Sequence, residues 1–171
     1  MYDFNAGTFN YPLSRVEMVD ENIPNLTHTA LPMKFIKGRY YKNIDSIDLA
    51  KQYFYEGMSK KINPYLMSSE AELADIYLAQ KSIDSAYYYS SKAFNTAPNH
   101  NFHRTVYFRT LLAKKDSSEL KNAFEKIRSY YNKSHYIDYI TTQFDLVGTN
   151  NEDLINVFNE FKTKFKLEND D

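Results

Sequence analysis

The sequence predicts an all-α chain built from antiparallel helical hairpins and preceded by an extended arm. Three observations support this fold class. Glycine is rare, with four in 171 residues, and the only prolines after Pro32 are Pro64 and Pro98, which stand 34 apart in the numbering. Apolar and small residues recur at this same spacing, and a fixed period of about 34 residues is typical of helical-repeat proteins. The chain is long enough to bury a core within one domain.

Residues 1–30 are expected to form the extended arm. They show no sustained helical period and contain Gly7, Pro12 and Pro24. Proline removes a backbone donor and holds the preceding residue in an extended conformation. Apolar residues such as Tyr2 and Val16 indicate that the arm either packs against the helical body or continues into a connection with an upstream segment.

Residues 31–171 form the predicted repeat domain, in units of about 31–64, 65–98, 99–132 and 133–167. The step that separates Pro64 from Pro98 also links three sets of second-helix positions. Ala50 and Ala86 are 36 apart instead, which indicates a two-residue extension near residues 60–63. The later units carry large residues where the earlier ones carry small residues, so we expect them to pack more openly. The three sets are Ala86, Leu120 and Leu154; Ser90, Phe124 and Phe158; and Ala93, Ile127 and Phe161.

Eight helices are expected, at about 31–43, 46–61, 67–80, 83–96, 101–114, 117–131, 135–147 and 152–167. Residues 69–72 and 116–119 have the spacing of capping boxes, in which a short polar side chain accepts from the first-turn amides. Polar turns within hairpins are expected at 42–46, 81–82 and 148–151.

The second unit resembles the tetratricopeptide repeat family, and the first unit does so at fewer positions. The match in the second unit comprises Leu73, Ala74, Tyr77, Ala86, Ala93 and Pro98, and that in the first comprises Gly38, Tyr41, Ala50, Phe54 and Gly57. Glu70 and Ser90 depart from the pattern, because the family has aromatic residues there. The third and fourth units resemble the family only by register. The resemblance implies a right-handed superhelix of about four hairpins whose first helices line a groove for peptides or proteins.

The same resemblance supplies candidate groove residues. Members that grip a C-terminal carboxylate place Lys and Asn at two of these positions, and this sequence does not, which argues against that type of clamp. Arg39 and Arg109 are either ligands for an acidic partner or ordinary solvated arginines. The candidates are Phe35, Arg39 and Lys42; Ala71, Asp75 and Leu78; and Thr105, Arg109 and Leu112.

Composition excludes several classes of function. The chain lacks cysteine, so thiol chemistry and disulfides are excluded. A net charge of −1 gives no basic excess for nucleic acid, and no run of apolar residues is long enough to insert in a membrane. The composition is that of a soluble chain, or of the soluble portion of a longer membrane protein. No glycine-rich phosphate loop can be written.

Catalytic, cofactor and metal sites are not predicted. His100 and His103 stand three residues apart at a helix start, but nothing in the sequence brings His28 and His135 close to them, so we expect packing rather than metal binding. The carboxylates of residues 70–75 are expected on a solvated helix face. The tyrosine runs, including residues 87–89, are expected mainly to pack between helices, because successive residues point about 100° apart.

A second resemblance concerns residues 26–107. Leu26-Thr27-His28, residues 63–65 (Asn-Pro-Tyr) and residues 84–89 (Asp-Ser-Ala-Tyr-Tyr-Tyr) are similar to tetratricopeptide regions attached to bacterial integral membrane proteins, including O-antigen ligase-like ones. This resemblance implies an accessory domain of the cell envelope.

Two hypotheses about function follow. The first is a non-catalytic scaffold for protein or peptide partners; the second is a helical glycan-binding or enzymatic domain, which predicts clustered polar residues in a cleft or stacked exposed tyrosines.

Overall fold

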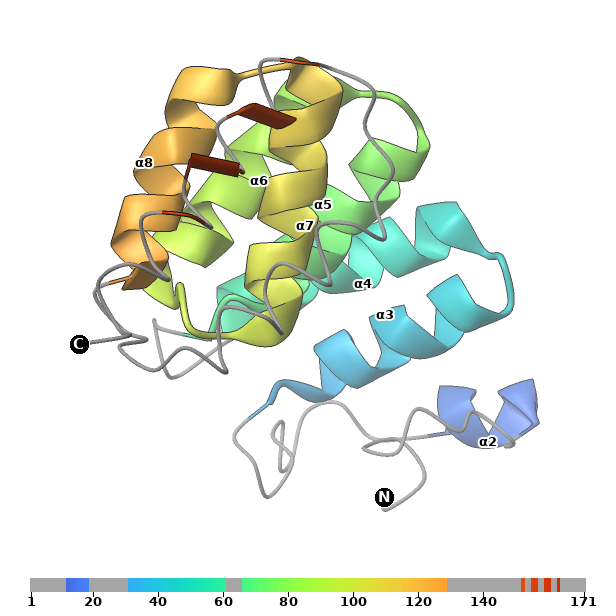
Figure 1. Cartoon of the computed structure of the whole chain (residues 1–171). Coiled ribbons are helices and arrows are strands. Elements are labelled where there is room, and N and C mark those ends of the chain that lie inside the picture. Colours follow the sequence, from blue (N-terminus) through green and yellow to red (C-terminus); the bar gives the residue numbers. More distant parts are fainter. Residues whose placement is uncertain are drawn as a thin grey trace.

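The computed structural model describes residues 12–18, 31–60 and 66–128, together with six positions between 152 and 163. Seven helices lie in this described part (Figure 1), and they confirm the all-α class. The six expected helices between 31 and 131 are present, with ends shifted by a few residues. The helices expected at 135–147 and, for the most part, at 152–167 lie outside the described residues. The bounds are α2 Leu13–Glu17, α3 Met33–Asn43, α4 Ile47–Lys60, α5 Ser68–Ala79, α6 Ile83–Thr96, α7 Asn101–Lys114 and α8 Ser117–Arg128.

Helices α3 to α8 pack as sequential pairs. Helix α3 packs on α4, α5 on α6 and α7 on α8, while α4 meets α5 and α6 meets α7 between the pairs. The first helices are also neighbours, since α3 contacts α5 and α5 contacts α7. Figure 1 shows this stack, with α3 and α4 at one end and α7 and α8 at the other. Three first helices therefore share one side of the described domain.

The turns inside the three hairpins have one common geometry. Asp45, Lys81 and Lys115 each adopt a left-handed conformation, with φ of 60°, 59° and 58°. Successive members stand 36 and then 34 apart, and these are the two steps found in the sequence. Each turn has the two backbone hydrogen bonds of a Schellman motif, which satisfy carbonyls at the helix end and offset the cost of a left-handed non-glycine residue. The pairs of donors and acceptors are Asp45 to Lys42 and Ser46 to Tyr41, Lys81 to Leu78 and Ser82 to Tyr77, and Lys115 to Leu112 and Asp116 to Leu111.

At one of the two predicted capping boxes the side-chain cap is present, without the reciprocal bond, because the Asp116 amide donates to the Leu111 carbonyl. The amide of Glu119 donates to the Asp116 carboxylate at 3.0 Å, so the cap of α8 is confirmed. The cap predicted at Ser69 is wrong, because α5 already begins at Ser68 and Met67 precedes it without a side-chain cap. Ser69 is buried instead, and its Oγ is 3.0 Å from where a Cβ on Gly57 would stand. The hydroxyl thus lies in the contact between α4 and α5.

The second-helix positions linked by the repeat are buried wherever the structure describes them. Six residues are at most 1% exposed, which confirms the register. Leu154, Phe158 and Phe161 lie outside the described residues. The six are Ala86, Ser90, Ala93, Leu120, Phe124 and Ile127.

Helix crossings change character along the stack. A Cβ on Gly38 of α3 would stand 2.7 Å from the ring of Phe54 on α4, so only glycine permits this approach. The equivalent crossing in the third hairpin holds Phe108 and Phe124, whose ring centroids are 5.2 Å apart. Two large side chains keep helices apart, and α7 and α8 bring far fewer residue pairs close together than the earlier hairpins do. The open packing expected for the third unit is confirmed.

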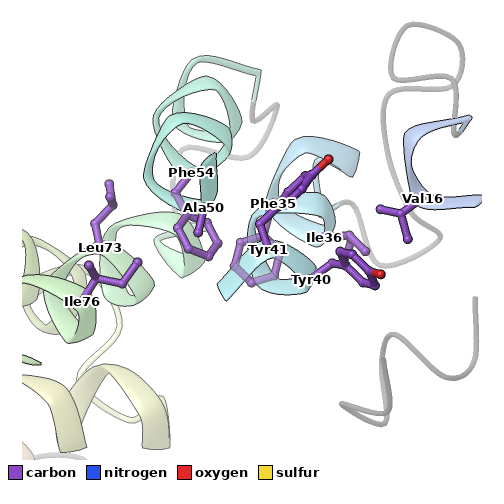
Figure 2. Packing of buried hydrophobic residues seen from close by; sticks show 9 residues of the cluster. All are labelled: Val16, Phe35, Ile36, Tyr40, Tyr41, Ala50, Phe54, Leu73 and Ile76. Carbon is purple, nitrogen blue, oxygen red and sulfur yellow. The ribbon is translucent and has the colours of Figure 1, made fainter. Parts of the chain in front are cut away.

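The arm contains one short helix, α2, where an extended chain was expected. Pro12 precedes it with φ of −64°, a value that suits the start of a helix, and the next five residues include neither glycine nor proline. Val16 of α2 is 1% exposed and belongs to the core cluster of the first hairpin. Figure 2 shows it beside Ile36 and Tyr40 of α3. The described part of the arm therefore packs against the helical body.

Candidate functional site

A connected set of charges joins the three first helices, and we call it the charge ladder. It comprises Arg39 and Lys42 of α3, Glu72 and Asp75 of α5, and Arg109 of α7. Lys42 Nζ lies 2.6 Å from Glu72 Oε2 and 2.7 Å from Asp75 Oδ2. Arg109 Nη1 donates to Asp75 Oδ1 at 2.8 Å, and Arg39 Nε lies 3.4 Å from Glu72 Oε1. The ladder thus bridges all three hairpins.

Helix periodicity explains how the ladder forms. Arg39 and Lys42 are three residues apart on α3, and Glu72 and Asp75 are three apart on α5, so each pair lies on one helix face. Asp75 and Arg109 are one repeat step apart, a separation of 34 in the numbering. Stacking places equivalent positions of successive hairpins side by side, and opposite charges therefore meet.

The cations of the ladder lie outermost. Side-chain exposure is 32% for Arg39, 27% for Lys42 and 41% for Arg109, against 11% for Glu72 and 23% for Asp75. Burial disfavours the Lys42 ammonium, but Glu72 and Asp75 outweigh it and raise the pKa of Lys42. Three cations meet two carboxylates, so this face presents positive charge to solvent although the chain carries a net −1.

Arg109 is the most exposed member of the ladder. Among the described residues its hydrogen bonding involves Nη1 alone, with Asp75 as the acceptor. A guanidinium carries five N–H donors in a planar fork that matches a carboxylate. Asp75 fixes one edge of this fork, and the donors on the other edge remain for a second acceptor.

The remaining groove candidates divide into two groups. Phe35 is 5% exposed and Ala71 is fully buried, so both side chains belong to the core rather than to an open surface. Figure 2 shows Phe35 within the packed cluster of the first hairpin. Leu78, Thr105 and Leu112 are half-buried and flank the ladder positions along α5 and α7. The structure therefore brings four of the nine candidates, Arg39, Lys42, Asp75 and Arg109, into one cluster.

The carboxylates of α5 do not lie on a solvated face, contrary to expectation. Glu70 is fully buried, and Glu72 is buried as a whole residue. Glu70 Oε1 lies 3.9 Å from Lys92 Nζ, while Lys34 and Glu56, each one repeat step earlier, pair at 2.6 Å. The first two hairpins therefore have an ion pair at equivalent positions, with the acidic and the basic residue exchanged. Repeat spacing relates Asp75 to Arg39 and Arg109, but no Lys or Arg stands one repeat step from Glu72, so this signal does not find Glu72.

His100 and His103 stack at the start of α7. Their ring centroids are 4.0 Å apart with 31° between the planes. Among the described residues no group of three histidine or acidic side chains gathers around a common point. His103 is 3% exposed, and burial lowers its pKa to about 4.

Tyrosines form a cluster at the junction of the first two hairpins. Tyr77 and Tyr89 stack at 5.8 Å, Tyr55 and Tyr88 meet Tyr89 edge-on, and the Tyr55 and Tyr77 hydroxyls share a hydrogen bond. Tyr88 is 59% exposed and Tyr55 is 39% exposed. An equivalent stack of Tyr41 on Tyr53, one repeat step earlier, indicates that the stacked pairs are part of hairpin packing. The two exposed rings remain accessible.

Comparisons with known proteins leave the family open. No family model, curated protein or solved structure matches the chain. Within the described ranges, no helix combines the length and apolarity that crossing a membrane requires.

Proposed function

We propose that the chain is a non-catalytic scaffold of the tetratricopeptide type, whose α3, α5 and α7 face binds an acidic segment of a partner protein. The charge ladder carries this proposal. Its cations lie further out than its carboxylates, and they come from α3 and α7, the helices on either side of the acidic α5. An extended peptide with several acidic side chains matches such a row better than a single terminal carboxylate does.

The internal repetition supports the scaffold assignment. The three Schellman turns recur at the two steps found in the sequence, and the buried second-helix positions follow the shorter of these steps. Gly38 permits the close crossing that the family makes through small residues. A repeat protein of this kind offers an extended surface rather than a single pocket.

A labelled peptide of alternating Glu and Gly tests the proposal, with its Gln/Gly counterpart as the uncharged control. We expect Arg109→Gln to weaken binding of the acidic peptide about tenfold, because a charge-assisted hydrogen bond contributes about 1.5–3 kcal/mol, which is reduced here by solvent exposure. Lys121→Gln on α8 removes the same charge from a residue outside the ladder. Fluorescence anisotropy measures the affinity of the wild type and of each variant for the acidic peptide.

Three results would contradict the assignment. They are absence of binding to the acidic peptide, equal binding of the Gln/Gly peptide, and equal losses in the Arg109 and Lys121 variants. Equal losses would mean that only net charge matters.

Carbohydrate binding is a second candidate, favoured by the exposed rings of Tyr55 and Tyr88 beside the stacked pair. Aromatic faces suit the apolar side of a sugar ring, and tyrosine hydroxyls supply hydrogen bonds. Titration with a soluble oligosaccharide should then quench tyrosine fluorescence in the wild type and not in Tyr88→Ala. Because of the resemblance to envelope proteins, we also propose that the chain binds either ligand as an accessory domain of a bacterial membrane protein.

A further inference from the structure

The start of α7 combines burial with missing hydrogen bonds. His103 is 3% exposed, and neither of its ring nitrogens has a hydrogen-bond partner among the described residues. Buried polar groups are normally paired, so an exception calls for a physical explanation. His103 stands one repeat step after Ser69, which packs between α4 and α5, and the ring of His103 lies near the Ala93 carbonyl of α6. His103 and the His100 ring stacked on it therefore lie at the junction of the second and third hairpins.

An apolar cluster lies at this junction around Phe102, the residue that precedes His103 in the sequence. Phe102 packs against Met67, which precedes α5, against Ala71 of α5 and against Ala93 of α6. Burial, followed by the neighbouring His100, disfavours the protonated His103 ring, and the nearby Ala93 carbonyl, which makes no hydrogen bond to the ring, offsets them only in part. Burial and Arg104 likewise lower the pKa of His100.

Charged groups on the packed helices offer the pair little compensation. Arg104 on α7 is buried and bonds to Asn101 Oδ1 at 3.0 Å. On α5 and α6, Glu70 and Lys92 face each other at 3.9 Å. His100 precedes the first residue of α7, and the amino end of a helix carries partial positive charge that disfavours further cations. Protonating both histidines would place three cations within the first turns of one helix.

We propose that His100 and His103 form an acid-sensitive latch that holds the third hairpin against the second at neutral pH and releases it when the imidazoles are protonated. Neutral rings stack and remain in the apolar junction. A charged His103 ring requires water, which the junction supplies only by opening, and a charge on the exposed His100 ring stacked against it adds repulsion. Because Arg109 is on α7, release also separates it from Asp75 and breaks the charge ladder between the second and third hairpins.

The sign and the pH window follow from the direction of the change in pKa. The pKa of His103 is 6.5 in an open chain and about 4 in the closed junction. The closed state is favoured above pH 6.5, and its advantage is lost progressively as the pH falls from 6.5 to about 4. At about pH 5 the opening equilibrium is expected to rise about thirtyfold over its neutral value.

Hydrogen–deuterium exchange tests the latch, with amide protection compared at about pH 7.5 and about pH 5 after correction for intrinsic exchange rates. We expect α7 and α8 to lose protection about thirtyfold while α3 and α4 change little. His103→Ser places there the residue of the equivalent position in the second hairpin and should remove most of this loss. The double variant His28→Asn/His135→Asn is the matched control and should retain it.

Two outcomes would overturn the latch. One is an equal loss of protection in α3 and α7, which would indicate general acid unfolding. The other is an unchanged pH dependence in His103→Ser. Should His103→Ser fold poorly, His100→Asn provides the same comparison, because removing the exposed partner leaves the buried ring in place and must still reduce the acid response.

Discussion

Replacing Gly38 with alanine directly perturbs the contact between α3 and α4 in the first hairpin. In Gly38→Ala the new Cβ would meet the Phe54 ring at 2.7 Å, well inside van der Waals contact. Overpacking of this kind costs about 1–3 kcal/mol, whereas alanine in a helix gains about 0.5–1 kcal/mol over glycine. We therefore expect a net loss of about 1–2 kcal/mol in the free energy of unfolding.

A double-mutant cycle with Phe54→Val isolates this contact, because valine lacks the ring atoms that approach Gly38. In the Phe54→Val background, Gly38→Ala should become neutral or stabilising by up to about 1 kcal/mol. Urea unfolding followed by circular dichroism measures all four proteins. Equal effects of Gly38→Ala in both backgrounds would show that the cost does not come from the Phe54 ring.

Three further substitutions test contacts along the stack, each by urea unfolding. Asp116→Ala should cost about 1 kcal/mol through loss of the cap on the Glu119 amide, and Ser117→Ala should cost much less. Tyr107→Phe should cost about 1 kcal/mol, because the buried ring donates its hydroxyl to Glu119 at 2.6 Å; no change would show that this bond contributes nothing. Asp75→Asn should cost about 0.5–1 kcal/mol at low ionic strength and less in about 1 M salt, and a loss independent of salt would contradict an electrostatic origin.

The helices, their pairing and the buried positions were predictable from the sequence. The repeat spacing and the positions of proline and glycine indicate them directly, because a residue such as Ala86 or Phe124 must occupy the same place in each hairpin. The Schellman turns were harder to anticipate, since Asp45 and Lys81 adopt a conformation that usually favours glycine. Their hydrogen bonds, and not their residue types, determine the turn.

The charge ladder was predictable only in part. Arg39, Lys42, Asp75 and Arg109 follow from the repeat register, but the register does not say which charges are buried. Glu72 was missed because acidic residues on a helix are usually solvated, and its burial depends on the cations of the neighbouring hairpin. Phe35 and Ala71 illustrate the reverse case, in which positions that line a groove in the family belong to the core of this chain.

The most direct test of the proposed recognition face is the nuclear magnetic resonance footprint of the acidic Glu/Gly peptide. The Arg109 and Arg39 side-chain Nε–H signals and the backbone amides of α5 should shift on titration. Signals from the outer residues of α4, α6 and α8 should remain unchanged. Shifts concentrated around Tyr55 and Tyr88, with the arginine signals unmoved, would contradict the account and favour the tyrosine cluster as the binding surface.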